Sequence, residues 1–198
     1  MNNPDTRELM ILASSSPYRR ALLERLGLPF TCHSPAVDET PMTGESPQAL
    51  VMRLAREKAA CAGKKYPGAI VIGSDQVAVH GADILVKPGD HEQARKQLLR
   101  LSGQMALFQT GLCVQNNATG TVHVDVVPCM VEFRKLDIAE IERYLAQERP
   151  YACAGSFKSE GLGISLLARI EGEDPTALVG LPLIRLCEML RSEGVQVP

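Results

Sequence analysis

The chain has 198 residues, of which 45% are hydrophobic and 22% are charged. This length and composition predict one globular domain, residues 1–198, with a sizeable core and room for two lobes. The formal net charge is −2, so the chain lacks the overall basic field of most nucleic-acid-binding proteins, and we expect no nucleic-acid partner.

The sequence also limits where the protein works. No apolar segment approaches the length of a membrane span, so we expect no membrane partner. The first 13 residues contain acidic side chains and a very short apolar run, which is not the pattern of a secretory signal. The six cysteines form no CxxC pair and no zinc-ligand cluster. They predict buried free thiols in a cytoplasmic, reducing compartment.

The first predicted elements are a strand and a helix. Residues 9–13 form a short apolar run followed by serines, which predicts a buried strand. Ser16 and Pro17 fit the N-cap and the first position of a helix with a leucine stripe. Arg19 and Arg20 lie in its first turn, where the helix dipole already places partial positive charge. Two cations at this end indicate that an anion binds nearby.

The next predicted elements lead to the centre of a sheet. Residues 29–34 predict a second strand, and residues 35–47, rich in turn-forming residues, predict a loop. Ser46 and the proline after it start a helix whose apolar residues recur at helical spacing as far as Ala62. Residues 69–73, AIVIG, are the clearest strand, and their unbroken apolar run favours a central position covered on both faces.

Six further elements are predicted: a helix at residues 90–101, antiparallel strands at 105–115 and 121–133, a helix at 137–149, a strand at 163–170 and a helix at 176–190. The first two of these helices open with a capping-box pattern. The order βαβαβ, followed by hairpins mixed with helices, predicts an α/β or α+β fold with a mixed sheet.

The common phosphate and hydrolase motifs are absent from the sequence. There is no GxxxxGK[ST], no GxSxG and no HExxH, and GLGISL at Gly161 is only half of a GxGxxG. The four histidines are scattered, which disfavours hydrolysis by a serine–histidine pair. The chemistry must therefore depend on other residues.

Two charged residues lie where an ordinary structural residue is not expected. Lys58 falls on the apolar stripe of its helix, between Ala55 and Ala62. It either reaches past the edge of the stripe to solvent or points a cation into a cleft. Asp75 follows the predicted central strand at its carboxyl end, where open α/β sheets bind ligands. The alternative for Asp75 is an aspartate that serves a turn or a cap.

Glu39 and Lys87 lie in predicted loops, where a charge alone means little. They complete a set of four cations and two carboxylates: Arg19, Arg20, Lys58, Lys87, Glu39 and Asp75. Cations suit phosphate oxygens, and carboxylates suit Mg²⁺. The set predicts a polyphosphate bound at the start of the first helix.

Motifs along the chain resemble those of the Maf family. ASSSPYRRALL at residues 13–23 resembles the family's opening signature, LAS-x-SPRR followed by a leucine pair. Six further motifs follow in the family's order: VDE at 37–39, EKA at 57–59, GSDQV at 73–77, KP at 87–88, CAGSFKSEG at 153–161 and VGLPL at 179–183. The resemblance covers residues 11–190.

The resemblance implies a nucleoside triphosphate pyrophosphatase, which hydrolyses the α–β phosphate bond and releases a nucleoside monophosphate and pyrophosphate. It implies a divalent metal cation, Mg²⁺ or Mn²⁺, as cofactor. The implied fold is an elongated α/β structure with a mixed sheet and a cleft between two lobes, related to inosine triphosphatase-like folds. Dimers are common in the family, so a homodimer is possible.

The resemblance gives two carboxylates the central roles. Asp75 would be the proton acceptor, and Glu39 would help to hold metal or water. A free aspartate has a pKa of about 3.9 and is a weak base toward ordinary water. Asp75 would therefore bind the metal, orient the water, or do both. Both residues are candidate catalytic residues and candidate metal ligands.

The resemblance assigns phosphate binding to Ser14, Ser16, Arg19, Lys58 and Lys87. Lys58 and Lys87 would also stabilise the charge that moves onto the leaving pyrophosphate, which makes them candidate catalytic residues. Arg20 belongs to the same motif and is a weaker candidate, because adjacent residues of a helix point in different directions.

Three positions depart from the family's dTTP/UTP pattern and resemble its 7-methyl-GTP branch: Tyr18, Gln76 and Glu160. Methylation at N7 makes guanine cationic, and the ring of Tyr18 would attract such a base. Ionised Glu160 accepts hydrogen bonds, which suits the N1–H and 2-amino donors of guanine, and Gln76 would touch base or sugar. The alternatives are that Tyr18 packs on its own helix and that Glu160 is solvated. Lys158 would pair with Glu160 or reach a phosphate.

The predicted function is hydrolysis of 7-methyl-GTP, which would remove a modified nucleotide from the pool. The first alternative is the same chemistry on dTTP, UTP or another modified nucleotide. The second is a nucleotide-binding regulator of septum formation without turnover. Asp75 argues against this regulator, because binding alone needs no water-activating carboxylate.

Overall fold

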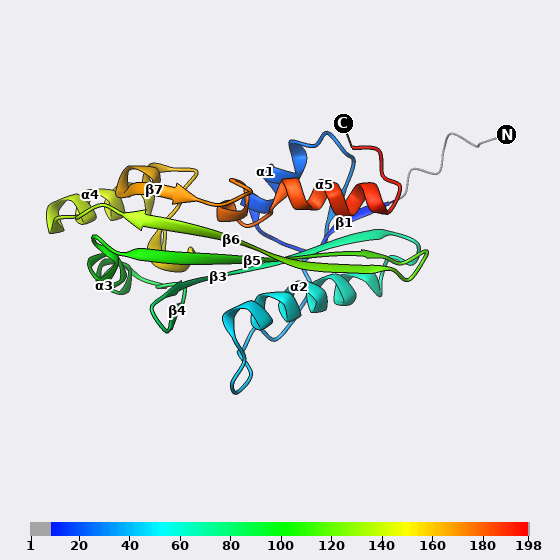
Figure 1. Cartoon of the computed structure of the whole chain (residues 1–198), viewed down its shortest axis with the longest axis horizontal. Helices are drawn as coiled ribbons and strands as arrows, with labels where there is room; N and C mark the ends of the chain where they lie inside the picture. The colour runs from blue at the N-terminus through cyan, green and yellow to red at the C-terminus, as the bar shows by residue number, and fades with distance from the viewer. Residues whose placement is uncertain (1–8, 198) are drawn as a thin grey trace.

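The computed structural model of the chain describes residues 9–197 (Figure 1). The expectation that the first 13 residues form no secretory signal falls mostly on residues outside this range, as do both ends of the predicted 1–198 domain. Among the described residues, no helix combines the length and the apolar character that crossing a membrane requires.

The described residues form seven strands, five α-helices and three short 3₁₀ helices. The strands are β1 (Met10–Leu12), β2 (Thr31–Cys32), β3 (Ile70–His80), β4 (Asp83–Leu85), β5 (Met105–Asn116), β6 (Val122–Phe133) and β7 (Leu167–Glu171). The helices are α1 (Pro17–Glu24), α2 (Pro47–Gly63), α3 (His91–Leu101), α4 (Ile138–Glu148), η1 (Ala154–Ser156), η2 (Leu162–Leu166), η3 (Ala177–Val179) and α5 (Leu183–Ser192).

The strands form one mixed sheet in the order β2-β1-β3-β5-β6-β7, and β4 pairs with the far part of β3. β1 runs parallel to β2 and β3, whereas β5, β6 and β7 continue the sheet antiparallel. β3 is central, as its apolar run predicts, because β1 and β5 lie on either side of it. The mixed sheet with its helices confirms the predicted α/β fold.

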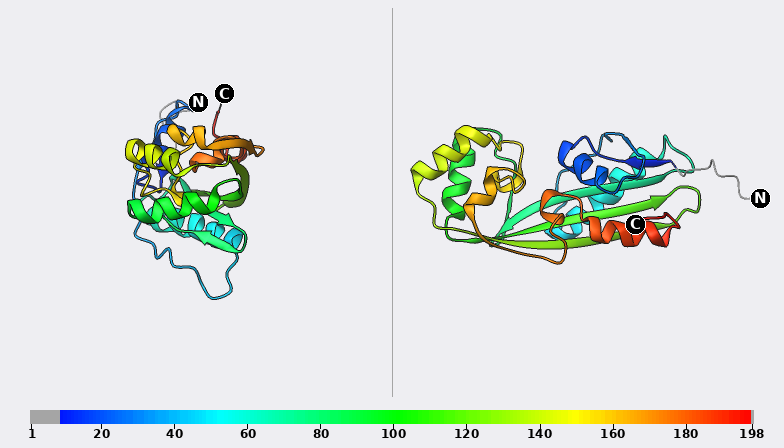
Figure 2. Two further views of the ribbon diagram at one scale, coloured as in Figure 1. Left: turned by 90° about the vertical axis from the view of Figure 1, so that its left-hand side faces the viewer. Right: turned by 90° about the horizontal axis from the view of Figure 1, so that it is seen from above.

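Three helices cover the two faces of one half of the sheet (Figures 1 and 2). α1 and α5 pack on one face, and α2 packs on the other. Side chains along β3 alternate accordingly, since Ile70 and Ile72 pack with α1 and α5, whereas Val71 packs with α2. These helices, with β1, β2 and the adjoining parts of β3, β5 and β6, are called the N-terminal lobe.

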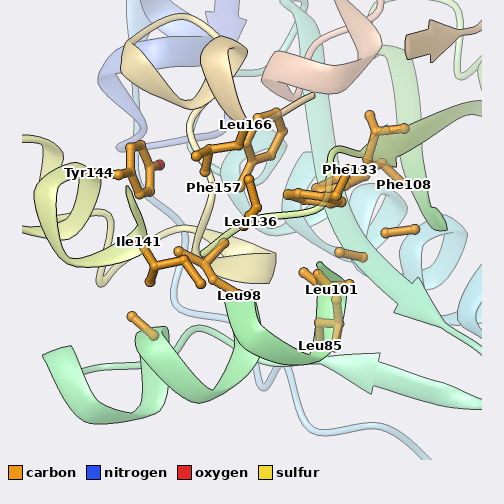
Figure 3. Close-up of a cluster of buried hydrophobic side chains, with 14 of the residues drawn as sticks. Leu85, Leu98, Leu101, Phe108, Phe133, Leu136, Ile141, Tyr144, Phe157 and Leu166 are labelled. Atoms are coloured by element: carbon orange, nitrogen blue, oxygen red, sulfur yellow. The ribbon is translucent and has the colours of Figure 1, made fainter. Parts of the chain in front are cut away.

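The other ends of β3, β5 and β6, with β4, α3, α4, η1, η2 and β7, form the distal lobe. Its core joins both helices to the sheet through Leu98, Ile141 and Phe157 (Figure 3). The ring of Phe157 packs edge-on against Phe108 and Phe133, with centroids 5.9 and 5.6 Å apart. The long strands pass through both lobes, which gives the molecule the elongated form seen in Figure 2.

Four of the five helix starts that the sequence predicts are confirmed. A side-chain oxygen of each N-cap residue accepts the backbone N–H three residues later, at Ser16, Ser46, Asp90 and Asp137. Each cap satisfies a backbone donor that has no partner within its own helix. These starts are local features, which explains why the sequence predicts them well.

The prediction for the end of the central strand is wrong. β3 continues past Gly73 to His80, so Asp75 lies inside the strand, opposite Gly111 of β5, and not at a carboxyl end. The strand continues because β5 pairs with it along its length and because the apolar alternation resumes at Val77. The function predicted for Asp75 therefore needs support from other contacts than its place at a sheet edge.

Three other boundaries differ from the prediction. The strand expected at residues 29–34 is only the two-residue β2, and the strand expected at 163–170 begins at Leu167, because η2 precedes it. The helix expected at 176–190 is divided into η3 and α5. Gly180, with a φ of 109°, ends η3 in a left-handed conformation, and Pro182 precedes α5 in extended backbone.

All six cysteines are free, as predicted, but the prediction that they are buried is only partly right. Cys113 and Cys129 are buried, whereas Cys32 is exposed and the other three are intermediate. Cys32 lies on the edge strand β2, which leaves its side chain open to solvent.

Candidate active site

A cavity of about 670 Å³ lies where the two lobes meet. The N-terminal lobe contributes residues from the start of α1, the loop before α2, and β3, and the distal lobe contributes residues near 84–87 and 152–160. All but one of the predicted site residues line it: Ser14, Ser16, Tyr18, Arg19, Glu39, Lys58, Asp75, Gln76, Lys87 and Glu160. The expected cleft between two lobes is therefore present.

The start of α1 fixes Arg19 at the cavity. Ser16 Oγ accepts the N–H of Arg19 at 3.3 Å, so this hydroxyl caps the helix. Arg19 Nε donates to the carbonyl oxygen of Gly180 at 2.8 Å, and its Nη1 donates to Ser14 Oγ at 3.5 Å. The guanidinium is thus held by the turn after β1 and by the segment before α5, which orients it before any phosphate binds.

Arg20 does not reach the cavity. Its Nε donates to Glu24 Oε1 at 2.9 Å, one turn along α1, and both side chains are more than half exposed. The candidate role of Arg20 in phosphate binding stays a prediction, and this placement does not support it. The reason is the 100° rotation between neighbouring helical residues, which directs Arg19 and Arg20 to different sides.

Lys58 joins the two candidate carboxylates. Its Nζ lies 2.6 Å from Asp75 Oδ1 and 2.6 Å from Glu39 Oε1. Lys58 and Asp75 are each only 8% exposed. Lys58 is therefore not a lysine that reaches past the stripe to solvent, and the alternative of a cation in a cleft is correct.

The alternation of β3 directs Asp75 toward α2. Val71, on the same face of the strand, packs against α2, and a Cβ added to Gly73 would lie 2.1 Å from the carbonyl oxygen of Ala55. Only glycine allows the helix to approach the strand this closely. Ala55 lies three residues before Lys58 on α2, so the close approach brings the Lys58 ammonium to Asp75.

The charges of the cavity influence one another. Burial acts to raise the pKa of Glu39, but the hydrogen bond from Lys58 and the positive charges of Lys58, Lys87 and Arg19 outweigh it and lower this pKa. Burial lowers the pKa of Arg19, and the negative charges of Asp75 and Glu39 act in the opposite direction. The cations and the carboxylates therefore form one electrostatic unit.

The distal lobe supplies the remaining candidates. Lys87 follows β4 and Glu160 precedes η2, and both are exposed side chains that line the cavity. Tyr18 of α1 is partly buried and lines the same cavity. One cavity therefore collects the candidates for phosphate binding and the candidates for base recognition from both lobes.

The other face of β3 is tied to the segment of η3. Ser74 Oγ donates to the carbonyl oxygen of Gly180 at 2.9 Å, and Gln76 Nε2 donates to the carbonyl oxygens of Ala177 at 2.8 Å and Leu178 at 3.1 Å. The amide nitrogen of Gln76 is thus engaged within the protein. This nitrogen fixes the segment that also holds Arg19.

A buried carboxylate shapes that segment. Asp174, 2% exposed, accepts hydrogen bonds from the N–H and the hydroxyl of Thr176 through Oδ1 and from the N–H of Ile184 through Oδ2. These bonds fix the turn that presents the Gly180 carbonyl to Arg19. Asp174 therefore belongs to the scaffold that positions the cavity's arginine.

Lys158 does not pair with Glu160, the first of the two contacts that the sequence suggests. Its Nζ donates to Glu148 Oε1 at 2.7 Å, and not to Glu160. The same nitrogen lies 5.4 Å from the centroid of the Tyr18 ring. Lys158 therefore lies beside the candidate base-recognition residue without being among the residues that line the cavity.

Two important contributors were missed by the sequence analysis. Glu148 ends α4, where a carboxylate opposes the helix dipole, and this unfavourable position was a signal that it has a partner. Gly180 contributes a backbone carbonyl, and no side-chain pattern reports where a carbonyl points. The first could have been found from the sequence, but the second could not.

The two carboxylates fit a small divalent cation. One nitrogen contacts an oxygen of both Glu39 and Asp75, so the two carboxylates face the same part of the cavity. Among residues 9–197 no group of three or more histidine, cysteine or acidic side chains could hold a metal. One or two carboxylates, completed by phosphate oxygens and water, are the ligand set that Mg²⁺ prefers.

Comparison with known proteins agrees with this site. Residues 9–193 match the Maf-like protein family. Proteins called 7-methyl-GTP pyrophosphatase in Pseudomonas syringae pv. tomato and Nitrosococcus oceani are 57% and 55% identical, over 96% and 95% of this chain and 98% and 94% of theirs. A protein of the same name in Pseudomonas fluorescens is 56% identical over 96% of this chain and 98% of its own. The chain therefore belongs to the Maf family.

Proposed function

We propose that this protein is a nucleoside triphosphate pyrophosphatase that hydrolyses 7-methyl-GTP to 7-methyl-GMP and pyrophosphate. The observation that carries the proposal is one cavity between the lobes, which brings Arg19, Lys58 and Lys87 together with the carboxylates of Glu39 and Asp75. The names of relatives that are 55–57% identical support the same substrate.

Three cations of the cavity bind the triphosphate in this proposal. Arg19 is preorganised by the Gly180 carbonyl, and its guanidinium offers a planar fork to phosphate oxygens. Lys87 is exposed at the cavity and supplies a mobile point charge from the distal lobe. Lys58 stabilises the charge that develops on the leaving pyrophosphate.

Asp75 orients the attacking water and accepts its proton. The water oxygen forms a bond to the α-phosphorus, the bond from that phosphorus to the α–β bridging oxygen breaks, and pyrophosphate leaves. Asp75 suits this role because it is buried at the cavity and held in place by Lys58. Its fixed position on β3 lowers the cost of orienting the water.

Glu39 and Asp75 are the residues that would hold a divalent cation, Mg²⁺ or Mn²⁺. When bound, such an ion supplies charge neutralisation on the phosphates and makes water a stronger nucleophile at neutral pH. The side chain of Glu39 is half exposed and lies on a loop, so it can change its position when the ion and the phosphates bind. Before an ion binds, the ammonium of Lys58 compensates the negative charges of the two carboxylates.

The base is recognised at the other end of the cavity. The Tyr18 ring attracts the positive charge that N7-methylation gives to guanine. Ionised Glu160 accepts hydrogen bonds from the N1–H and the 2-amino group. Removal of a modified nucleotide from a cytoplasmic pool is the purpose we propose, and the six free thiols suit such a compartment.

A substrate panel tests the proposal. Purified protein is incubated with 7-methyl-GTP, GTP, dTTP and UTP, with Mg²⁺, with Mn²⁺ or with a chelator, and pyrophosphate and orthophosphate are measured separately. We expect 7-methyl-GTP to give the highest kcat/KM, pyrophosphate as the phosphate product, and no turnover with the chelator. In ¹⁸O-labelled water the label should appear in 7-methyl-GMP.

Other outcomes would support the alternatives. Faster cleavage of dTTP or UTP would keep the chemistry and overturn the base preference. Release of orthophosphate alone would overturn cleavage at the α–β bond. Tight nucleotide binding with no cleavage of any nucleotide, in the presence of either metal, would favour the regulator without turnover.

A further inference from the structure

A salt bridge lies beside Tyr18, one of the residues proposed to recognise the base. Lys158 Nζ donates to Glu148 Oε1 at 2.7 Å, and the two side chains are 24% and 10% exposed. The hydrogen bond to Glu148 raises the pKa of Lys158, and the same bond lowers the pKa of Glu148. Both partners therefore carry their charges throughout the neutral pH range.

Glu148 has a second contact, which fixes its position. Its Oε2 accepts the N–H of Leu162 at 2.7 Å, at the start of η2. A Cβ added to Gly161 would lie 2.4 Å from the same oxygen, so glycine at this position allows the carboxylate to reach the backbone. The end of α4 is thus joined to the segment that carries Lys158 and Glu160.

Lys158 is close to Tyr18 but does not line the cavity. Its Nζ lies 5.4 Å from the centroid of the Tyr18 ring, within the range of a cation–π interaction. Tyr18 itself lines the cavity. A base that stacks on Tyr18 would therefore share this ring with a nearby cation of the protein, Lys158.

We propose that Glu148 makes this end of the cavity selective for a cationic base by neutralising Lys158 beside Tyr18. This inference rests on the proposed function, since it concerns how 7-methyl-GTP is preferred over GTP. Glu148 touches neither the base nor the phosphates in this proposal, so it is a positioning residue that sets the local charge. Without Glu148, the unpaired ammonium of Lys158 would lie beside the ring on which the cationic base stacks.

The size of the effect follows from distance. With the base stacked roughly 5 Å from the ring and the ammonium 5.4 Å from the ring centroid, the two charges lie at most roughly 10 Å apart. At that distance an unpaired like charge weakens binding by about two- to tenfold, depending on the effective dielectric constant. The base of GTP is neutral and is not repelled by the ammonium. The ratio of the kcat/KM values for 7-methyl-GTP and GTP therefore measures this repulsion alone.

The test compares Glu148→Gln, Lys158→Met and the double variant. Glutamine keeps an acceptor for the Leu162 N–H but removes the charge. For Glu148→Gln we expect the preference for 7-methyl-GTP over GTP, as the ratio of kcat/KM values, to fall about two- to tenfold, mainly through KM. Lys158→Met should keep or raise the preference, and the double variant should recover it. Added salt should shrink the difference between Glu148→Gln and wild type.

Glu142→Gln is the matched control, because Glu142 lies on the same helix and is paired with Arg95 and His91 away from the cavity. It should leave the ratio unchanged. An equal loss for both nucleotides in Glu148→Gln, or no recovery in the double variant, would overturn the inference and indicate a structural role. If the wild-type protein does not prefer 7-methyl-GTP over GTP, the proposed function itself fails.

Discussion

Lys58 is the residue on which the charge balance of the cavity depends. It draws together a carboxylate from a loop, Glu39, and a carboxylate from the middle of a strand, Asp75, at 2.6 Å each. A buried cation is destabilising when no acidic partner compensates its charge. The contacts of the site are therefore mutually dependent, and single substitutions should be read with their partners in mind.

Asp75→Asn should lower kcat by about 10²- to 10⁴-fold, because an amide cannot accept the proton of the attacking water. Lys58 keeps Glu39 as a partner in this variant, so the protein should stay folded. Pyrophosphate release under saturating 7-methyl-GTP measures the loss, and circular dichroism checks the fold. Asp83→Asn, an exposed aspartate outside the cavity, is the control. Full turnover by Asp75→Asn would exclude its role.

Tyr18 and Glu160 should together decide the base. Tyr18→Arg combined with Glu160→Gln places a like charge before the cationic base and turns a pure acceptor into a mixed donor and acceptor. We expect this double variant to lose more than tenfold in kcat/KM for 7-methyl-GTP. Tyr18→Phe keeps the aromatic face and should lose less than threefold. Equal losses in the two variants would contradict stacking on Tyr18.

α1 and α4 each carry charge at an end that the helix dipole disfavours. Arg19 and Arg20 lie in the first turn of α1, and Glu148 ends α4. Each of these three side chains has a polar partner in the structure, namely Gly180, Glu24 and Lys158. A charge at a disfavoured helix end therefore indicates a polar partner. Two of these pairs, Arg19 with Gly180 and Glu148 with Lys158, lie at or beside the candidate site.

The contact between Glu45, in the loop before α2, and Arg53 of α2 should stabilise the fold in a pH-dependent way. Hydrogen bonds from Arg53 and from the N–H of Met42 lower the pKa of Glu45 from 4.5 to about 2. A carboxylate whose pKa is lower in the folded state stabilises the fold above its unfolded pKa and loses that effect as pH falls. The difference in Tm between wild type and Glu45→Gln should therefore be full above about pH 5 and disappear toward pH 2. A constant difference over this range would contradict the assignment.

The contact between α2 and β3 leaves no room for a methyl group. Gly73→Ala would place a Cβ 2.1 Å from the Ala55 carbonyl oxygen, which forces α2 away from the strand and Lys58 away from Asp75. We expect a loss of about 3 kcal/mol or more in the free energy of unfolding, measured in urea, and a raised KM for the nucleotide. Gly27→Ala, where nothing lies within 4 Å of the added Cβ, should leave KM unchanged. Wild-type stability for Gly73→Ala would contradict the close packing.

For the molecule as a whole, the sequence predicts what is local and misses what depends on pairing at a distance. Caps at Ser16 and Asp90, the order of the elements and the central position of β3 follow from neighbouring residues. The length of β3 does not, because its second half is held by β5, which follows β4 and α3 in the chain. The Gly180 carbonyl that holds Arg19 was missed for the same reason, since it lies 161 residues later in the chain.

The residues of the cavity were found from the sequence because their charges stand out, but their arrangement was not. Asp75 was expected at the edge of the sheet and lies within it, and the ammonium of Lys58 was expected to face either solvent or a cleft. The first position depends on the pairing of β3 with β5, and the second on the packing of α2 on Gly73, and no charge pattern records either. The identity of a site is thus easier to predict than its geometry.

The two lobes should unfold together, because β3, β5 and β6 pass through both of them. Two thiols report on the lobes separately: Cys113 is buried beside α2, and Cys129 is buried in the distal core. Burial raises the pKa of Cys113 to about 12 and that of Cys129 to about 11, so neither thiol reacts while the protein is folded.

Brief labelling with a thiol reagent across a urea series, followed by peptide mass spectrometry, gives an unfolding midpoint at each site. We expect the two midpoints to coincide with each other and with the loss of circular dichroism, as in a single cooperative transition. Exposed Cys32 should react at every urea concentration and serves as the control for labelling. An earlier midpoint at Cys129 would show that the distal lobe opens by itself, and the strands would then not couple the two halves of the cavity.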